Sequence, residues 1–216
     1  MTGAFADWLL VHAAPAEAIV LPGVTTCCLG VGKTAAALEL YATLLSLEGR
    51  RPVRGVLLFG VAGAFPDRHR PAPSPVRLGE VCVVGSEHFG DEGVETPDGF
   101  WDLSRLQLGE VGPFPANGRV AAAAAEQLGA PIVSGVTVSS CSGTEAASRR
   151  MFERCCADVE TMEGAAVALV CRRRELPLLQ VRGISNWTGD RDRGGWDLGR
   201  AVQATHEAVR KLCAPR

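Results

Sequence analysis

The chain has 216 residues, of which 47% are hydrophobic, and a formal net charge of −2 at pH 7. This length fits one domain, residues 1–216, with its own hydrophobic core. The lysines and arginines are scattered along the sequence, which argues against nucleic acid or an anionic membrane as a partner and favours a small neutral or anionic ligand. No window approaches the roughly 18 apolar residues of a membrane span, so we expect a soluble protein.

Short apolar segments bounded by glycine alternate with helical patterns along the chain. The segments expected to be strands are 8–11, 24–29, 53–59, 80–84, 132–139 and 178–184, and the expected helices are 34–48, 118–128, 144–155, 163–175 and 198–212. Several of the strands are nearly continuous in Val, Leu and Ile, as is typical of strands buried on both faces. The alternation predicts an α/β fold, a three-layer α/β/α sandwich around a central mixed, largely parallel sheet.

The proline-rich run and the cysteines indicate how the domain is organised and in which compartment it works. The proline-rich run 68–80 is expected to be an irregular surface loop inside one domain, because strands on both sides of it are needed for one sheet. The eight cysteines include no Cys-x-x-Cys pair of the kind that holds zinc or carries out redox chemistry. Most of them lie in apolar runs, so we expect free thiols in a cytoplasmic protein, and no metal site.

The stretch LGVGKTAAALEL, residues 29–40, has the outline of a phosphate-binding loop. A Walker A loop requires a further glycine at the position held by Cys27, so this interpretation fails. What remains is the turn Gly30-Val31-Gly32 between a strand and a helix, which would aim backbone amides at an adjoining crevice. A tight turn with no ligand fits this feature equally well, and Lys33 is expected at the helix start, in solvent.

Two further segments could border the same crevice. Residues 59–65, FGVAGAF, follow a buried strand, and ligands in open α/β sheets bind at the carboxyl ends of strands. Glu163 stands at the first turn of an apolar helix, where a buried carboxylate needs a compensating partner and could accept hydrogen bonds from a ribose diol. Glu163 could instead be a helix-start charge favoured by the helix dipole.

The strand 178–184 runs into Ser185 and Asn186 at the same predicted edge. An amide side chain donates and accepts hydrogen bonds at once, which suits the edge of a purine. A terminal asparagine is also common as a turn residue, so the role of Asn186 is open on this evidence.

Read in order, the motifs HAAPAE, GVGK, GVAG, LGEVCVV, SGT, MEGAA and ISN resemble the nucleoside phosphorylase and nucleosidase superfamily, particularly the nucleosidases that hydrolyse methylthioadenosine and adenosylhomocysteine. Within it, GISNWTGDRDRGGW and HFGDEG are most similar to the futalosine hydrolases. Those enzymes cleave the N-glycosidic bond of futalosine and release hypoxanthine, in menaquinone biosynthesis. The resemblance implies a nucleoside phosphorylase-like fold, a nucleoside substrate, no metal or organic cofactor, and a homo-oligomer, a dimer or higher.

The resemblance also implies roles for single residues. Glu17 would activate the attacking water, Met162 and Glu163 would lie beneath the ribose, and Asn186 would face N7 and the 6-substituent of the purine, with Val31 near the 5′ group. The implied substrate contacts are Gly30, Val31, Gly32, Val61, Ala62, Gly63, Ser142, Gly143, Thr144, Met162 and Ser185.

Asn186 replaces an aspartate of the adenine nucleosidases. An amide does not repel a 6-oxo group as a carboxylate would, but it also binds the edge of adenine, so the choice between 6-oxo and 6-amino purines stays open. The alternatives are a methylthioadenosine/adenosylhomocysteine or aminodeoxyfutalosine nucleosidase, a purine nucleoside phosphorylase, and a non-catalytic purine-binding regulator. The residue that stacks on the base is not assigned.

The 5′ substituent has candidate contacts that the sequence leaves unresolved. Phe100 and Trp101 could wall its pocket or pack on their own subunit, and Arg191 and Arg193 could meet a ligand carboxylate or be solvated.

Overall fold

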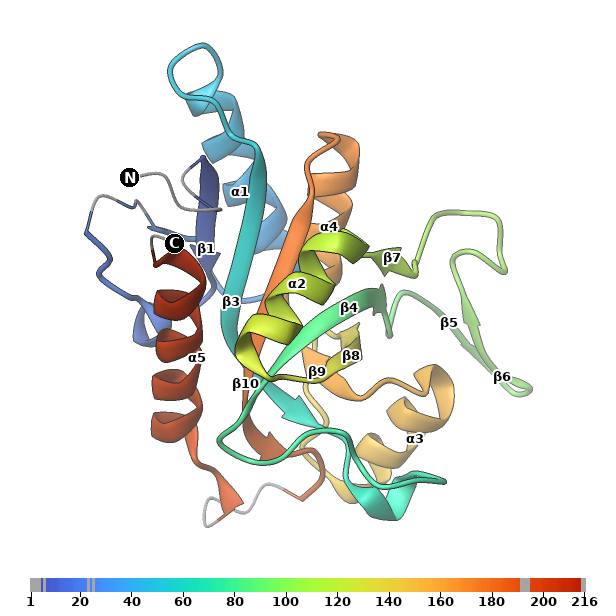
Figure 1. Ribbon diagram of the computed structural model, residues 1–216. Coiled ribbons are helices and arrows are strands. Elements are labelled where there is room, and N and C mark those ends of the chain that lie inside the picture. The colour runs from blue at the N-terminus through green and yellow to red at the C-terminus, as the bar shows by residue number, and fades with distance from the viewer. Residues whose placement is uncertain (1–4, 6, 23, 25, 191–194, 215–216) are drawn as a thin grey trace.

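The computed structural model describes residues 5, 7–22, 24, 26–190 and 195–214. It is an α/β/α sandwich in which helices cover both faces of a central sheet (Figure 1). The strands are β1 (Trp8–His12), β2 (Thr26–Cys28), β3 (Gly55–Ala64), β4 (Val81–Phe89), β5 (Gly93–Thr96), β6 (Gly99–Asp102), β7 (Phe114–Pro115), β8 (Ile132–Thr137), β9 (Val159–Thr161) and β10 (Leu178–Trp187). The helices are α1 (Lys33–Leu47), α2 (Gly118–Leu128), α3 (Glu145–Cys155), α4 (Gly164–Arg173) and α5 (Leu198–Cys213), with short 3-10 turns η1 (Pro15–Glu17) and η2 (Asp67–His69).

The main sheet is mixed and largely parallel, as predicted. Its strand order is β10-β4-β8-β9-β3-β1-β2, with β7 on β4, and β10 also pairs with β3. This extra pairing closes β10, β4, β8, β9 and β3 into a ring. Strands β1, β2, β3 and β10 run one way, and β4, β8 and β9 run the other. Because β9 is antiparallel to β3 and pairs with its last two residues, Gly63 and Ala64, the chain after β9 turns back toward the middle of β3.

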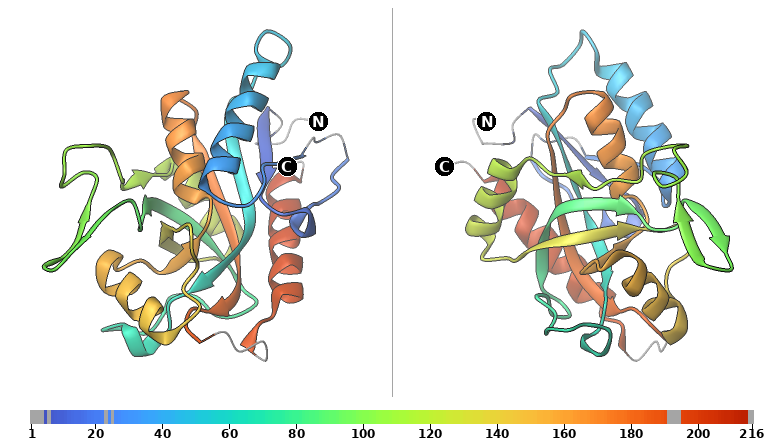
Figure 2. Two further views of the ribbon diagram at one scale, coloured as in Figure 1. Left: turned by 180° about the vertical axis from the view of Figure 1, so that it is seen from behind. Right: turned by 90° about the vertical axis from the view of Figure 1, so that its right-hand side faces the viewer.

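Two apolar cores hold the three layers together. On β3, Val56 and Leu58 pack with α1 and α4, whereas Leu57 and Phe59 pack with α2 and α5. Successive side chains of a strand point to opposite faces, so a continuous apolar run on β3 serves both cores. Figure 2 shows α1 and α4 on one side of the sheet and α2 and α5 on the other.

Most predicted elements are present, with informative differences. The glycine cluster expected as a turn after residue 59 lies inside β3, which continues to Ala64. β10 likewise continues through Ser185 and Asn186, with a bulge between Ile184 and Asn186. The proline-rich run is irregular apart from η2 at its start, and the strands that flank it, β3 and β4, belong to one sheet.

The described residues contain no helix long and apolar enough to cross a bilayer.

Helix α5 lies close against β10 because residue 183 has no side chain. A Cβ at Gly183 would collide with the backbone oxygen of Ala201 and with Thr205 on α5. The contact is with backbone, so relief requires the helix itself to move.

We therefore expect Gly183→Ala to destabilise the fold by about 1–3 kcal/mol, the usual cost of overpacking. Gly199→Ala is the matched control, because Gly199 is exposed within α5 and nothing lies near its would-be Cβ. That control should gain about 0.5–1 kcal/mol from helix propensity. Urea unfolding measures both; equal stability of the two variants would contradict the close packing of α5 on β10.

Candidate active site

Glu17 is a buried carboxylate fixed by backbone donors. Its Oε2 accepts hydrogen bonds from the amides of Ala13 and Ala14, at 3.0 and 2.9 Å, and its Oε1 accepts from the amide of Val61 at 2.9 Å. A Cβ at residue 60 would collide with this carboxylate, so Gly60 is what lets η1 sit against β3. The side chain is thus held in one orientation, with lone-pair capacity left for a further donor.

Glu163 lies across from Glu17 and is equally buried. Its Oε1 accepts a hydrogen bond from the amide of Gly32 at 3.0 Å, and its Oε2 lies 3.9 Å from Nη1 of Arg182. Burial raises the pKa of the Glu163 carboxyl, while the charge of Arg182 and the Gly32 amide act to lower it and the charge of Glu17 acts to raise it. The two carboxylates are therefore near enough to influence each other.

The turn 30–32 contributes a backbone amide to this site. Gly30 and Gly32 have positive φ angles of 83° and 96°, which glycine adopts without strain. The amide of Gly32 points at the carboxylate of Glu163 rather than at open crevice. Val31 is exposed at the surface of the turn.

Two threonine hydroxyls cap the start of α4, so the Glu163 side chain does not have to. Glu163 is the N-cap residue of α4 but makes no capping hydrogen bond with its side chain. Instead the amides of Gly164 and Ala165 donate to the hydroxyls of Thr161 and Thr137, at 3.3 and 2.7 Å. Both hydroxyls in turn donate to Oε1 of the fully buried Glu87, at 2.9 and 2.8 Å. Two of the orphan amides of the helix are thus satisfied without the Glu163 side chain, and Glu163 can face the crevice.

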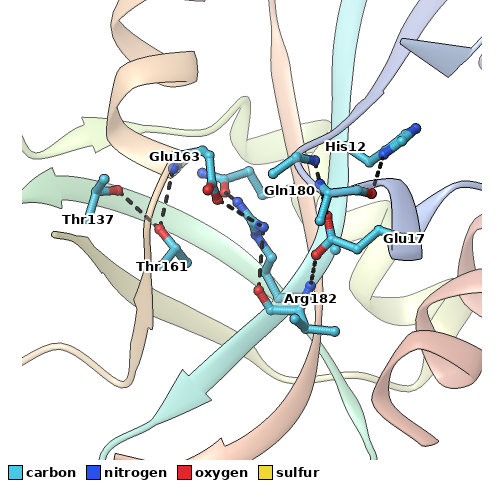
Figure 3. A network of polar contacts seen from close by, with 12 residues as sticks. His12, Glu17, Thr137, Thr161, Glu163, Gln180 and Arg182 are labelled. Atoms are coloured by element: carbon cyan, nitrogen blue, oxygen red, sulfur yellow. Dashed lines mark hydrogen bonds and ion pairs between the residues drawn. The ribbon is translucent and has the colours of Figure 1, made fainter. Parts of the chain in front are cut away.

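Arg182 is a buried cation beside Glu163 that the sequence interpretation missed. It is 1% exposed, and Figure 3 shows it pointing toward Glu163. Its other contacts are long: Nη1 to the backbone oxygen of Val61 at 3.5 Å and Nη2 to Oε1 of Gln180 at 3.4 Å. A buried guanidinium requires an acidic partner, so an arginine inside the apolar run LLQVRGIS was the signal that could have identified it.

A pocket at the carboxyl ends of β3 and β10 gathers several predicted purine contacts. It is lined by Gly63, Cys141, Ser142, Gly143, Glu160, Asn186, Trp187, Gly189 and Trp196. Asn186 has a fixed amide: Nδ2 donates to the Trp187 backbone oxygen at 3.0 Å, and Oδ1 accepts from the Ser185 hydroxyl at 2.8 Å. One N–H of Asn186 is left for a ligand. Trp187 and Trp196 are the aromatic side chains of this lining, and so are candidates for stacking on a base.

Other predicted contacts lie around the pocket rather than in its lining. Thr144 is the N-cap of α3, where its hydroxyl accepts from the amide of Ala147 at 3.2 Å. Ala62 is buried, and its backbone oxygen lies 3.2 Å from the hydroxyl oxygen of Ser185. Val61 and Met162 are half-buried beside Glu17 and Glu163.

The expectation that Lys33 lies in solvent is wrong. Its side chain is 12% exposed and pairs with Asp91 and with Glu92, the latter at 3.1 Å. Asp91 also accepts from the amide of Ser139 at 2.6 Å. Two acids gathered beside the start of α1 hold the ammonium inward, so Lys33 ties the turn 30–32 to the segments that follow β4 and β8.

The aromatic residues considered for the 5′ pocket pack on their own subunit. Arg154 lies over the ring of Phe100 at 3.6 Å, and Arg105 lies over that of Trp101 at 4.1 Å. Arg191 and Arg193 lie outside the described residues.

Comparison with known proteins identifies the family of the chain. The family model for the phosphorylase superfamily matches residues 19–214. Futalosine hydrolase of Thermus thermophilus is 34% identical over 188 residues, covering 86% of this chain and 79% of that protein. Futalosine hydrolase of Streptomyces coelicolor is 35% identical over 184 residues, covering 85% and 74%.

Solved structures share the fold at lower identity. A futalosine hydrolase mutant of Helicobacter pylori superposes with a TM-score of 0.75 at 17% identity, covering 94% of this chain and 96% of that one. The methylthioadenosine/adenosylhomocysteine nucleosidase of Neisseria meningitidis, in complex with methylthio-immucillin-A, gives a TM-score of 0.76 at 15% identity, covering 94% and 96%. The chain belongs to the phosphorylase superfamily and, within it, to the futalosine hydrolase family.

Proposed function

We propose that this protein is a futalosine hydrolase, a purine nucleosidase that cleaves the N-glycosidic bond of futalosine to hypoxanthine and dehypoxanthine futalosine. The observation that carries the proposal is the convergence of Glu17, Glu163 and Arg182 at Val61 of β3. Two residues farther along the same strand, Gly63 lines a pocket that contains Asn186. The identity to named futalosine hydrolases supports the choice of substrate.

The arrangement suits a dissociative mechanism. As the glycosidic bond lengthens, positive charge develops on the ribose, and Glu163 stabilises it through hydrogen bonds from the sugar hydroxyls. Arg182 favours the ionised form of Glu163 that this role requires. Glu17 orients a water and takes its proton as the water attacks the anomeric carbon. Asn186 supports the departing base with its available N–H, since an amide cannot give up a proton.

Hydrolysis is favoured over phosphorolysis by how the donors of the crevice are used. A phosphorylase needs cationic or amide donors free to bind phosphate. The Gly32 amide is engaged by Glu163, and Arg182 is paired with the same carboxylate. These contacts keep the Gly32 amide and Nη1 of Arg182 from binding phosphate, which supports water as the nucleophile.

The resemblance to the futalosine hydrolases also supports a domain organisation, a cellular location and an oligomeric state. We propose that the whole chain acts as one nucleosidase domain, in the cytoplasm and in menaquinone biosynthesis, with no metal or organic cofactor. We also propose a homo-oligomer, a dimer or higher. Leu38, Tyr41 and Leu45 support this, because they form an apolar stripe on the outer face of α1, with 68%, 45% and 45% exposure.

The direct test is chromatography of the free base released from futalosine, aminodeoxyfutalosine, methylthioadenosine and inosine, each with and without phosphate. We expect hypoxanthine from futalosine at a rate that phosphate does not change. Strict dependence on phosphate would show a phosphorylase, and tight purine binding without any released base would show a regulator.

Glu163→Gln tests the role of the ribose-facing carboxylate. The amide keeps the shape and the acceptor for the Gly32 amide but removes the negative charge, so kcat should fall roughly 10²–10³-fold, as for loss of a transition-state electrostatic contact. Glu153→Gln, at an exposed position of α3, serves as the control and should keep wild-type kcat. Near-normal turnover by Glu163→Gln, with circular dichroism of a folded protein, would refute the proposed role.

A further inference from the structure

Glu160 on β9 is a buried carboxylate that the mechanism does not use. It is 5% exposed, and both of its oxygens accept hydrogen bonds from Ser142: Oε1 from the amide at 2.8 Å and Oε2 from the hydroxyl at 2.6 Å. None of the ion pairs formed among the described residues includes it. Burial of a carboxylate without a cation is costly and raises the pKa of the Glu160 carboxyl, so its presence calls for a function.

The pairing of β9 with β3 aims Glu160 at the purine pocket. The strands are antiparallel, and Glu160 is directly opposite Gly63. Cross-strand partners project from the same face of a sheet, and a Cβ at Gly63 would lie 3.3 Å from Nδ2 of Asn186. Glu160 and Asn186 therefore lie on either side of Gly63, on the same face of the sheet, and both line the same pocket.

The two side chains present complementary chemistry to a ligand. Each oxygen of Glu160 has one partner from Ser142 and keeps acceptor capacity, whereas Asn186 keeps an N–H donor. A 6-oxopurine offers an N1–H donor beside the O6 acceptor. A 6-aminopurine offers the reverse, an N1 acceptor beside an N6 donor. An acceptor-only carboxylate next to an amide donor matches the first pattern and opposes the second.

We propose that Glu160 determines specificity for 6-oxopurines, its carboxylate accepting the N1–H of the base while Asn186 donates to O6 or N7. This inference rests on the proposed function, because it requires that a purine binds in this pocket. It decides between 6-oxopurines and 6-aminopurines, a choice that Asn186 alone leaves open. Adenine is rejected because its N1 lone pair would face the carboxylate lone pairs.

The test is Glu160→Gln, with binding of free hypoxanthine and free adenine followed by fluorescence of Trp187 and Trp196, which line the pocket. Wild type should prefer hypoxanthine. In the variant the affinity for hypoxanthine should fall about 10- to 100-fold, as for a lost hydrogen bond to a charged group. Adenine should bind more tightly, because the amide can donate to its N1. The ratio of kcat/KM for futalosine over aminodeoxyfutalosine should fall in parallel.

Glu153→Gln is again the matched control and should leave both affinities unchanged. Glu160→Asp is the second variant: it keeps the charge, so the preference for hypoxanthine should persist with weaker binding. A thermal midpoint near that of wild type establishes that each variant is folded.

If folded Glu160→Gln keeps the wild-type ratio of hypoxanthine affinity to adenine affinity, the inference is overturned. This includes an equal loss of both affinities, which would indicate a structural role for Glu160. Loss of the preference in folded Glu160→Asp would likewise count against a charged acceptor. Because the readout is free-base binding, it is separate from the proposed function. If the wild-type protein binds hypoxanthine but does not cleave futalosine, the proposed hydrolase function is refuted. The ratio of hypoxanthine affinity to adenine affinity in Glu160→Gln then still decides whether Glu160 determines base specificity.

Discussion

The structure depends on placing several carboxylates in its interior with one buried guanidinium among them. Within the described residues, Glu17, Glu87, Glu160 and Glu163 are each at most 6% exposed, and Arg182 is the buried cation. Such burial is unfavourable unless hydrogen bonds and charge compensate for lost water. The fold supplies these from the backbone amides of Ala13, Ala14 and β3, the threonine hydroxyls and the Gly32 turn. The elements that surround the crevice are therefore fixed by the same contacts that prepare its carboxylates.

The sequence predicts those elements whose own residues are mostly apolar. Strands β1 and β3 are apolar nearly throughout, and the first seven residues of β10 are apolar except Gln180 and Arg182, so their patterns predict the strands and the sandwich they form. The local pattern does not predict β9, because the strand has only three residues, Val159–Thr161, and two of them are polar. They are buried only through tertiary partners, Ser142 for Glu160 and Glu87 for Thr161. The pairing that makes β9 a strand is absent from local sequence.

The candidate site shows the same division. Glu17, Glu163 and Asn186 stand in motifs that resemble a known superfamily, so they could be named in advance. Arg182 lies within a largely apolar strand, and the acidic partners of Lys33, Asp91 and Glu92, are distant in sequence, so the local pattern places neither side chain. Side-chain partners set by strand pairing and loop contacts decide whether a charged residue is solvated or buried, and that information is tertiary.

The measurement that tests the central claim most directly is the pH dependence of kcat/KM for futalosine. The account requires an ionised Glu163 whose carboxyl has a pKa raised by burial above its ordinary value of 4.5. Activity should therefore be constant near neutral pH and fall as the pH drops through a value above 4.5, where protonation removes the charge that stabilises the ribose. Activity that stays constant down to pH 4.5 would contradict the account.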